Sequence, residues 1–256
     1  MKSKEWCRIL SQEKIAADIY SMWLETPSIA PEARAGQFVS LYCGDKSRLL
    51  PRPISLCEVD REARRIRLVY RIAGKGTEEF SNMKAGEQIS VLGPLGNGFP
   101  LERARGRRAI LFGGGIGIPP MLETAKQLKG EKSIVLGYRY ERFLQKEFAE
   151  QGDLYIATED GSFGTRGNVL DAVREQQVQG DVVFACGPAP MLRALKAWAG
   201  ERGIECWISM EERMACGIGA CLACVCRSGE IDEHSQVHNK RVCKDGPVFL
   251  ASEVEL

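Results

Sequence analysis

Four cysteines near the C-terminus follow the spacing Cys-x4-Cys-x2-Cys with a more distant fourth member: Cys216, Cys221, Cys224 and Cys243. Side chains that bind one inorganic centre require the chain between them to fold around that centre. This spacing is the plant-type pattern for a [2Fe-2S] cluster. Gly217 and Gly219 lie between the first two cysteines, where they let the backbone curl and direct N–H groups at sulfur. The segment therefore predicts one-electron chemistry.

Other interpretations of the cysteines remain open. Structural zinc also uses four cysteines, typically as two short paired knuckles, and this segment has only one Cys-x2-Cys. His234 and His238 precede Cys243, but a Rieske centre needs each histidine in a paired pattern with cysteine, so both are predicted to be loop residues. Cys226 is surplus to a four-ligand set. The spacing favours the cluster over zinc or unligated thiols.

The overall composition narrows the classes of partner. The chain has 256 residues, and its 35 Lys and Arg balance 34 Asp and Glu without a basic run, so neither nucleic acid nor a membrane is expected as a partner. Residues 1–10 lack the apolar core of a signal peptide, and no apolar stretch is long enough to cross a bilayer. We expect a cytoplasmic protein whose ten cysteines are metal ligands or small core residues rather than disulfides.

Residue patterning divides the chain into three parts. Six strand-like runs lie between Trp6 and Leu92, and the alternation in residues 65–71 is typical of a half-buried antiparallel strand. Beyond Arg108, apolar runs alternate with helical stretches, one of them over residues 142–150, which predicts a parallel sheet covered by helices. The predicted fold class is multi-domain α+β. It comprises an antiparallel β-barrel over residues 1–100, an α/β parallel-sheet domain over 101–210 and a small cluster domain over 211–256.

A glycine-rich loop joins the first strand of the second domain to a helix. Its residues Gly113, Gly114, Gly115 and Gly117 let the backbone approach a pyrophosphate, and Pro119 suits a helix start that offers free N–H groups. The loop departs from the Rossmann pattern, because a proline replaces the last glycine and Arg139 stands where an acidic residue would bind a ribose. An ordinary tight turn is the alternative, and Arg139 and Arg142 leave NAD and NADP both open.

Two further strand ends in this domain carry polar or reactive residues. Asp160 follows one strand, and Cys186-Gly187-Pro188 follows another. Ligands of such sheets bind outside the carboxyl ends of the strands, so Cys186 could approach a nicotinamide ring. A buried strand-end thiol explains Cys186 equally well.

The barrel half contains two motifs suited to a flavin nucleotide. In Arg52-Pro53-Ile54-Ser55, the arginine could bind a phosphate and Ser55 could hydrogen-bond a flavin ring edge. In the second motif, Arg71 ends a strand and Gly76-Thr77 opens a helix, which is another place for a pyrophosphate. Taken alone, both arginines could be solvated strand charges and Thr77 a helix N-cap.

The motifs occur in an order that resembles the ferredoxin reductase superfamily. With the added segments 211–221, 242–249 and 93–100, most of the chain is similar to the electron-transfer subunits of dihydroorotate dehydrogenase B. The resemblance implies a [2Fe-2S] cluster on the four cysteines and NAD as co-substrate. It implies FAD at the following residues: Arg52, Pro53, Ile54, Ser55, Val69, Tyr70, Arg71, Gly76 and Thr77.

The same resemblance implies a partner and a pathway. A catalytic subunit would oxidise dihydroorotate at FMN and pass electrons through cluster and FAD to NAD+, in pyrimidine biosynthesis, with two copies of each subunit. FAD must lie between the other two groups, because nicotinamide exchanges hydride, a cluster exchanges one electron and a flavin does both. Two alternatives remain: a related reductase subunit serving a hydrogenase, oxygenase or bifurcating transhydrogenase, and a zinc-stabilised interaction module without enzyme activity. No residue is assigned to acid–base catalysis, and Ser55 and Cys186 are the candidates nearest the reacting rings.

Overall fold

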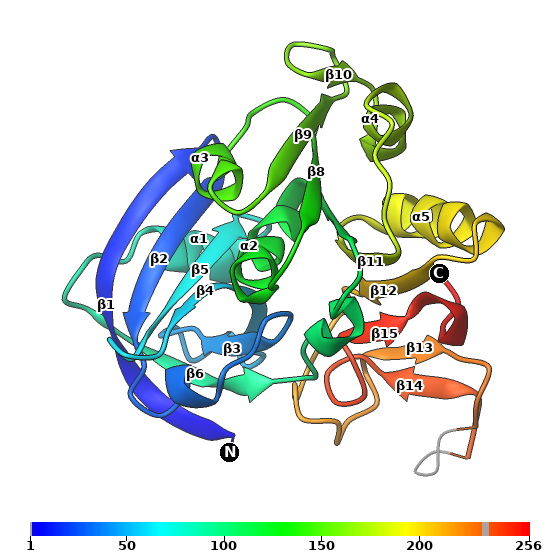
Figure 1. Cartoon of the computed structure of the whole chain (residues 1–256). Helices are drawn as coiled ribbons and strands as arrows, with labels where there is room; N and C mark the ends of the chain where they lie inside the picture. The colour runs from blue at the N-terminus through cyan, green and yellow to red at the C-terminus, as the bar shows by residue number, and fades with distance from the viewer. Residues whose placement is uncertain (1, 232–235) are drawn as a thin grey trace.

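The computed structural model describes residues 2–231 and 236–256, so that His234 lies outside the described residues. A β-barrel, an α/β domain and a small C-terminal unit lie side by side, with the C-terminal unit next to both of the others (Figure 1). This architecture confirms the predicted fold class. Within the described residues, no helix has the length and apolar character needed to span a membrane.

Six antiparallel strands close the barrel in the order β1-β2-β5-β4-β3-β6. Ile66, Leu68 and Tyr70 of β5 all point into its core, as their alternation predicts. In the sequence, helix α1 (Lys75–Ser81) follows β5 and precedes β6. The strand bounds are β1 (Ser3–Ala16), β2 (Ile19–Glu25), β3 (Phe38–Tyr42), β4 (Arg52–Asp60), β5 (Arg65–Arg71) and β6 (Gln88–Leu95), with a 3-10 turn η1 (Ala30–Glu32) after β2.

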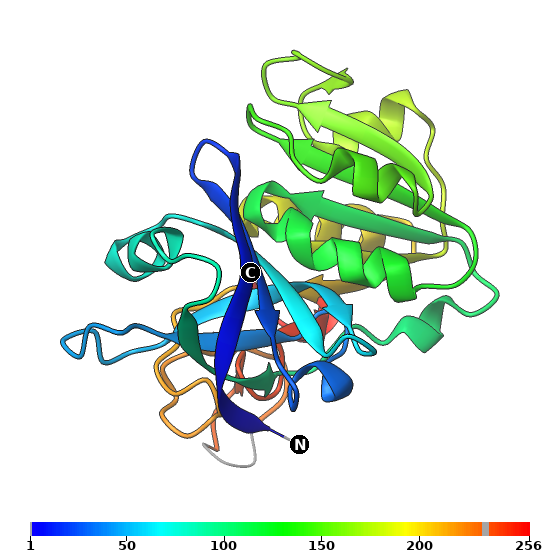
Figure 2. The same cartoon turned by 90° about the vertical axis from the view of Figure 1, so that its left-hand side faces the viewer.

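The α/β domain has a seven-stranded sheet in the order β10-β9-β8-β7-β11-β12-β15. Helices α2 and α3 cover one face and α4 and α5 the other (Figures 1 and 2). Its strands are β7 (Ala109–Gly114), β8 (Lys132–Tyr138), β9 (Asp153–Thr158), β10 (Thr165–Arg166), β11 (Val182–Cys186), β12 (Glu205–Ser209) and β15 (Val248–Leu250). The helices are α2 (Ile118–Gln127), α3 (Gln145–Ala149), α4 (Val169–Glu175) and α5 (Ala189–Glu201), with 3-10 turns η2 (Leu101–Ala104) and η3 (Gly115–Gly117).

One helix of this domain begins later than the sequence predicts, and the sheet has one strand more. A helix expected over 142–150 begins only at Gln145, because Leu144 has a φ of 61° and so interrupts the helical backbone. The predicted parallel sheet is confirmed, since every strand pairing within residues 101–210 is parallel, and β15 adds one antiparallel strand at its edge beside β12. Strand β15 comes from the cysteine-rich segment, and three residues are too few to show a period.

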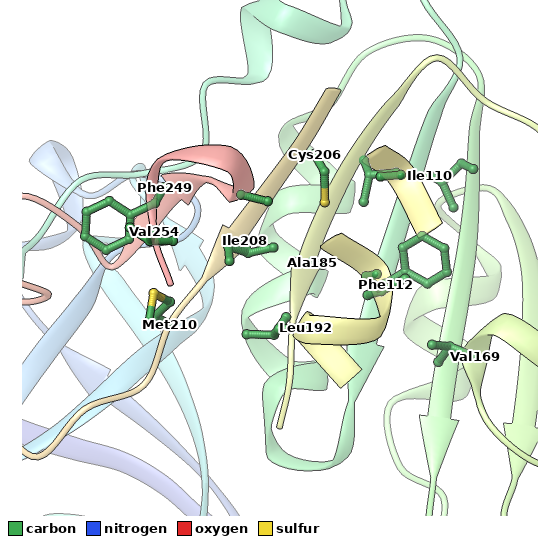
Figure 3. Packing of buried hydrophobic residues seen from close by; sticks show 14 of the residues in the cluster. Ile110, Phe112, Val169, Ala185, Leu192, Cys206, Ile208, Met210, Phe249 and Val254 are labelled. Carbon is green, nitrogen blue, oxygen red and sulfur yellow. The ribbon is translucent and has the colours of Figure 1, made fainter. Parts of the chain in front are cut away.

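The C-terminal unit shares a hydrophobic core with the α/β domain. Figure 3 shows Phe249 and Val254 beside Ile208 and Met210, in the same buried cluster as Phe112 of the central strand. Its other elements are a two-stranded sheet of β13 (Val225–Arg227) and β14 (Asn239–Arg241), and a final 3-10 turn η4 (Ala251–Glu253). The cluster-binding segment is therefore anchored on the α/β sheet rather than tethered by a free linker.

A buried carboxylate joins the barrel to the α/β domain. Glu123 of α2 is 3% exposed, and it accepts a hydrogen bond of 2.9 Å from the backbone N–H of Val59 on β4. Burial raises the pKa of this carboxyl, and its hydrogen bonds from Gln127 and Val59 act in the opposite direction. Beside it, Lys126 of α2 forms an ion pair with Glu58 of β4. Helix α2, which begins at the glycine loop, is thus fixed to the barrel wall.

We expect Glu123→Ala to destabilise the protein, because the Val59 N–H would be left buried without an acceptor. That loss costs about 1–3 kcal/mol. Thermal unfolding should show a melting temperature lower by roughly 2–4 °C for each kcal/mol lost. Glu123→Gln is the matched control, since its amide oxygen can still accept from Val59, and it should melt closer to the unchanged protein. Equal melting of the alanine variant and the unchanged protein would contradict this role.

Candidate functional site

A cleft of about 480 Å³ opens between the barrel and the start of the C-terminal unit. Its volume lies within the range of small-molecule and cofactor sites. Barrel residues at its wall include all nine predicted for FAD. The complete lining is Phe38, Arg52, Pro53, Ile54, Ser55, Val69, Tyr70, Arg71, Ala73, Gly74, Lys75, Gly76, Thr77, Ile116, Ser209, Met210, Glu211, Glu212, Met214 and Pro247.

The two phosphate-suited motifs of the barrel converge in this cleft. A Cβ atom added to Gly76 would lie 2.3 Å from Nε of Arg52, so only a residue without a side chain lets the guanidinium lie against the helix start. Arg52 is also held by a hydrogen bond to the carbonyl oxygen of Leu50. A fixed cation beside a bare stretch of backbone N–H groups fits a pyrophosphate.

Thr77 shapes this loop from within. Its hydroxyl accepts hydrogen bonds from the N–H groups of Ala73 (2.8 Å) and Gly74 (3.2 Å) and donates to the Gly74 carbonyl oxygen (3.0 Å). The N-cap of α1 is Gly74, so the alternative of Thr77 as N-cap is wrong. Thr77 closes the turn that presents Gly76 to the cleft.

Sequence reasoning missed the far wall of the cleft. Met210, Glu211 and Met214 come from the connection between β12 and the cluster segment. The signal available was that β12 ends at the same sheet edge as the glycine loop. Glu211 reaches solvent through the cleft but is crowded by protein atoms; this desolvation raises the pKa of its carboxyl, while the positive charge of Arg71 opposes the rise.

The glycine loop and the Cys186 motif meet at the carboxyl edge of the α/β sheet. A Cβ atom on Gly117 would lie 2.5 Å from the carbonyl carbon of Cys186, and one on Gly114 would lie 2.5 Å from Sδ of Met191. Cα of Gly114 lies 3.2 Å from the position of a Cβ atom on Gly187. The close approach requires glycine at these positions.

Other predicted residues of this edge are placed as follows. Pro119 is buried in the first turn of α2, and Gly113 lies at the end of β7. Asp160 is exposed in the turn after β9, where its side chain accepts from the N–H of Ser162 at 3.0 Å. Cys186 is 1% exposed, does not line the cleft, and has a pKa raised by burial.

Both arginines that bear on NADP recognition have partners. Arg139 lies 3.6 Å from a carboxylate oxygen of Glu159, and the guanidinium of Arg142 lies 3.9 Å from the ring centre of Phe163. The Arg139 and Glu159 side chains are 72% and 65% exposed, and such a surface ion pair is weak.

The segment 216–224, which holds the first three cluster cysteines, is called the cysteine loop. Backbone N–H groups in and beside this loop point at sulfur atoms. Sγ of Cys216 accepts from Ile218 (3.4 Å) and Ala220 (3.3 Å), and Sγ of Cys224 accepts from Cys243 (3.4 Å). Burial acts to raise the pKa of the Cys216 thiol, but hydrogen bonds from these N–H groups and from Cys221 outweigh it and lower the pKa to about 6. N–H donors of this kind stabilise a ligand thiolate.

The four cysteines are arranged as two pairs. After the effect of burial, Cys221 contributes to the lowered pKa of Cys216, and Cys224 contributes to the raised pKa of Cys243. Among the residues that the structure describes, no three His, Cys, Asp or Glu side chains gather closely enough around one point to hold a single ion. A centre with two irons, each bound by two cysteines, fits two pairs of thiols.

The turns of this loop require unusual backbone conformations. Gly217 and Gly219 have φ angles of 69° and 88°, as the predicted tight curl requires. Leu222 also has a positive φ of 57°, a conformation that costs a residue with a side chain. Arg241, 5% exposed, donates to the Gly219 carbonyl oxygen at 3.4 Å and pairs with Asp245, and so braces the loop from behind.

Cys226 lies apart from these pairs. It is on β13, 8% exposed, and its thiol donates to the carbonyl oxygen of Lys240 at 3.5 Å. Burial raises the pKa of Cys226 to about 11. His238, in the loop before β14, has Nδ1 3.1 Å from the carbonyl oxygen of Gly229.

We expect Arg52→Ala to weaken FAD binding, because it removes a charge-assisted contact from the converged site. The loss of about 1.5–3 kcal/mol corresponds to roughly tenfold or more in retention of FAD on dialysis. Arg65→Ala is the matched control, since Arg65 is on the same barrel but pairs with Asp60 outside the cleft. Equal retention in both variants would move the phosphate site elsewhere.

The chain is similar to known proteins over its whole length. Residues 211–255 match the model of the iron-sulfur cluster binding domain of dihydroorotate dehydrogenase B. The chain is 47% identical over 263 residues to "Dihydroorotate dehydrogenase B (NAD(+)), electron transfer subunit" of Geobacillus sp. (strain WCH70), with 100% of both chains covered. It is 46% identical to the protein of the same name in Bacillus velezensis, with 97% of each covered.

Two solved structures have a similar fold. The first is an NADH-dependent reduced ferredoxin-NADP oxidoreductase studied for flavin-based electron bifurcation, with a TM-score of 0.85, 30% identity and coverage of 97% of this chain and 89% of that one. The second is a ferredoxin NADP+ reductase from Neisseria gonorrhoeae, with a TM-score of 0.67, 16% identity and coverage of 78% and 92%.

Proposed function

This chain belongs to the family of dihydroorotate dehydrogenase B electron transfer subunits, and on that premise we propose that it carries electrons from a dihydroorotate-oxidising partner to NAD+. The observation that carries the proposal is that the flavin cleft and the cluster site lie next to each other. Met214, two residues before the first cluster cysteine, lines the flavin cleft, and Gly217 of the cysteine loop contacts the barrel at Ser40. A one-electron site therefore adjoins a flavin site within one chain.

The residues present divide the work among three sites. Bound flavin would accept single electrons and release hydride, and the cluster would supply the single electrons. Arg52 and the Gly76 turn would hold the FAD pyrophosphate, and Ser55 lies in the wall of the same cleft. The glycine loop and the Gly187-Pro188 turn would bind NAD, and Ile116 of that loop lines the flavin cleft. Cys216, Cys221, Cys224 and Cys243 bind the [2Fe-2S] cluster.

The proposal extends to the catalytic partner. We infer that this partner carries FMN, that two copies of each subunit assemble, and that the complex serves pyrimidine biosynthesis in the cytoplasm. The family name implies a catalytic subunit. A reducing compartment suits a chain whose ten cysteines are all free of disulfides.

The test is an activity that needs both chains. The native complex should contain FAD, FMN and iron, and it should reduce NAD+ when given dihydroorotate. The isolated chain should oxidise NADH with ferricyanide as acceptor, because its own cleft supplies a flavin site. It should give no turnover with dihydroorotate, because we place that oxidation at the FMN of the partner. Oxidation of dihydroorotate by the isolated chain would overturn the proposed division of labour.

A second candidate follows from the structural similarity to the ferredoxin-NADP oxidoreductase, which is 30% identical over nearly the whole chain. In that case the chain would serve a bifurcating partner. The same complex should then reduce NADP+ from NADH and reduced ferredoxin, and dihydroorotate should have no effect. The higher identity to the dihydroorotate dehydrogenase subunits favours the first function.

The cysteine loop should face the partner, because its apolar residues are exposed. Ile218 and Leu222 are 45% and 37% exposed. We expect Leu222→Asp to weaken the complex by roughly tenfold or more, as a charge is buried at an apolar contact. Leu222→Asn is the matched control, because both residues tolerate the positive φ at this position.

Affinity for the catalytic subunit and dihydroorotate-linked NAD+ reduction should both fall in the aspartate variant, with iron content and NADH oxidation by ferricyanide retained. If the aspartate and asparagine variants bind the partner equally well, the loop does not face it.

A further inference from the structure

A large aromatic side chain on the outer wall of the barrel is left uncovered by the described part of the chain. Trp6 of β1 is 69% exposed, whereas its neighbour Cys7 is fully buried in the barrel core. Side chains alternate across a strand, so the indole stands outward from the barrel. Tryptophan is one of the residue types enriched among the anchors of protein interfaces.

Strand register places a second aromatic ring in the same row. Trp6 pairs with Ser90 of β6, and Ser90 pairs with Tyr42 of β3. All three face outward, because the residues that alternate with them are buried in the core. The ammonium group of Lys4 lies 3.9 Å from the ring centre of Tyr42. This row is an aromatic surface with a cation at its edge.

The next outward row runs directly under the cysteine loop. Lys4 pairs with Leu92, and Leu92 pairs with Ser40. A Cβ atom on Gly217 would lie 3.0 Å from the hydroxyl oxygen of Ser40, so the cysteine loop rests on this row. Trp6 is two strands and two residues from Ser40, a Cα separation of about 12 Å. Figures 1 and 2 both place the N-terminal half of β1 and the cysteine loop at the same end of the barrel.

One surface therefore continues from the cysteine loop onto the barrel. Its apolar members are Ile218 and Leu222 on the loop and Trp6 and Tyr42 on the barrel. Lys4 and Lys2 precede Trp6 in sequence, and both are exposed. Aromatic and apolar side chains at the centre with charged groups at the rim are the usual composition of a protein interface.

We propose that this surface binds the catalytic subunit and that Trp6 is an anchor of the contact. The inference rests on the proposed function, since the face that delivers electrons must meet the partner and Trp6 is continuous with it. The partner should present an apolar pocket for the indole, bordered by carboxylates that complement Lys2 and Lys4. The interface would thus span two domains of this chain, with the barrel fixing the orientation of the cysteine loop.

The experiment compares two outward-facing tryptophans of the barrel. Trp6→Ala should weaken binding of the purified catalytic subunit by roughly tenfold or more, the scale of an interface anchor. Trp23→Ala is the matched control: Trp23 lies on β2, the strand on the opposite side of β1 from β6, and stacks on Arg65. It should leave that affinity unchanged. Both variants should keep their iron content and their NADH oxidation by ferricyanide, because neither residue lines the cleft or the cysteine loop.

Three results would overturn the inference. First, the Trp6 variant and the unchanged chain could bind the catalytic subunit equally well, with dihydroorotate-linked NAD+ reduction intact in both. Trp6 would then not be an anchor, and the proposed function would be unaffected. Failure of the unchanged chain to bind the catalytic subunit or to support that reaction removes both together. Self-association of the unchanged chain in sedimentation, abolished by Trp6→Ala, would assign the surface to a second copy instead.

Discussion

Replacing Cys221 by serine should remove the iron, abolish the visible absorption of the cluster and reduce dihydroorotate-linked NAD+ reduction by at least about 100-fold. A serine oxygen is a poor substitute for thiolate at iron, and a change that merely perturbs the surroundings of a ligand already costs 10–100-fold. NADH oxidation by ferricyanide should persist, since the flavin cleft and the glycine loop are built largely from other parts of the chain. Iron analysis, the visible spectrum and the two assays measure these effects.

Cys226→Ser is the matched control for this experiment. Cys226 donates to the Lys240 carbonyl oxygen, and a serine hydroxyl can donate in the same place, so iron content and activity should change little. Loss of iron in this variant, or its retention in the Cys221 variant, would overturn the assignment of the four ligands.

Adding one methyl group at Gly117 should weaken NAD(H) binding. The Cβ atom of an alanine would lie 2.5 Å from the carbonyl carbon of Cys186, which is backbone and has no flexible end to move aside. The loop or the Cys186 turn would have to shift, at a cost of about 1–3 kcal/mol. The Kd for NADH should rise by roughly 10- to 100-fold. Titration of the loaded protein with NADH, with FAD and iron contents verified, measures this.

Gly200→Ala is the matched control for the glycine loop. An alanine there meets nothing within 4 Å and lies near the end of α5, so NADH affinity should be unchanged. If Gly117→Ala binds NADH as tightly as this control, the Gly117 contact does not shape the NAD site.

The features that the sequence predicted best depend on residues close together in the chain. The cysteine spacing and its glycines describe one loop, and the strand Arg65–Arg71 shows its own alternation. The contact between Arg52 and Gly76 depends on the closure of the barrel, which no short window of sequence encodes. The same holds for Glu211 and Met214, which line the cleft only because the C-terminal unit folds back against the barrel.

The sequence also failed to predict a short strand, the start of one helix and the burial of one carboxylate. Strand β15 is too brief for a period, and the positive φ of Leu144 gave no residue-type signal that would shorten α3. The burial of Glu123 was also unreadable, since its acceptor role depends on a backbone N–H of the barrel. For Glu123 the deciding partner, Val59, lies 64 residues away along the chain.

The pairing of β12 with β15 gives the cysteine-rich unit the topology of an insertion. Ser209 lies opposite Val248, and the N–H of Met210 donates to the carbonyl oxygen of Pro247 at 2.9 Å, so the unit leaves and rejoins the sheet at one point. A short hairpin could bridge that point without disturbing the strands on either side. The redox unit is therefore inserted between two neighbouring strands of the α/β sheet, and both of its ends are held at one edge of that sheet.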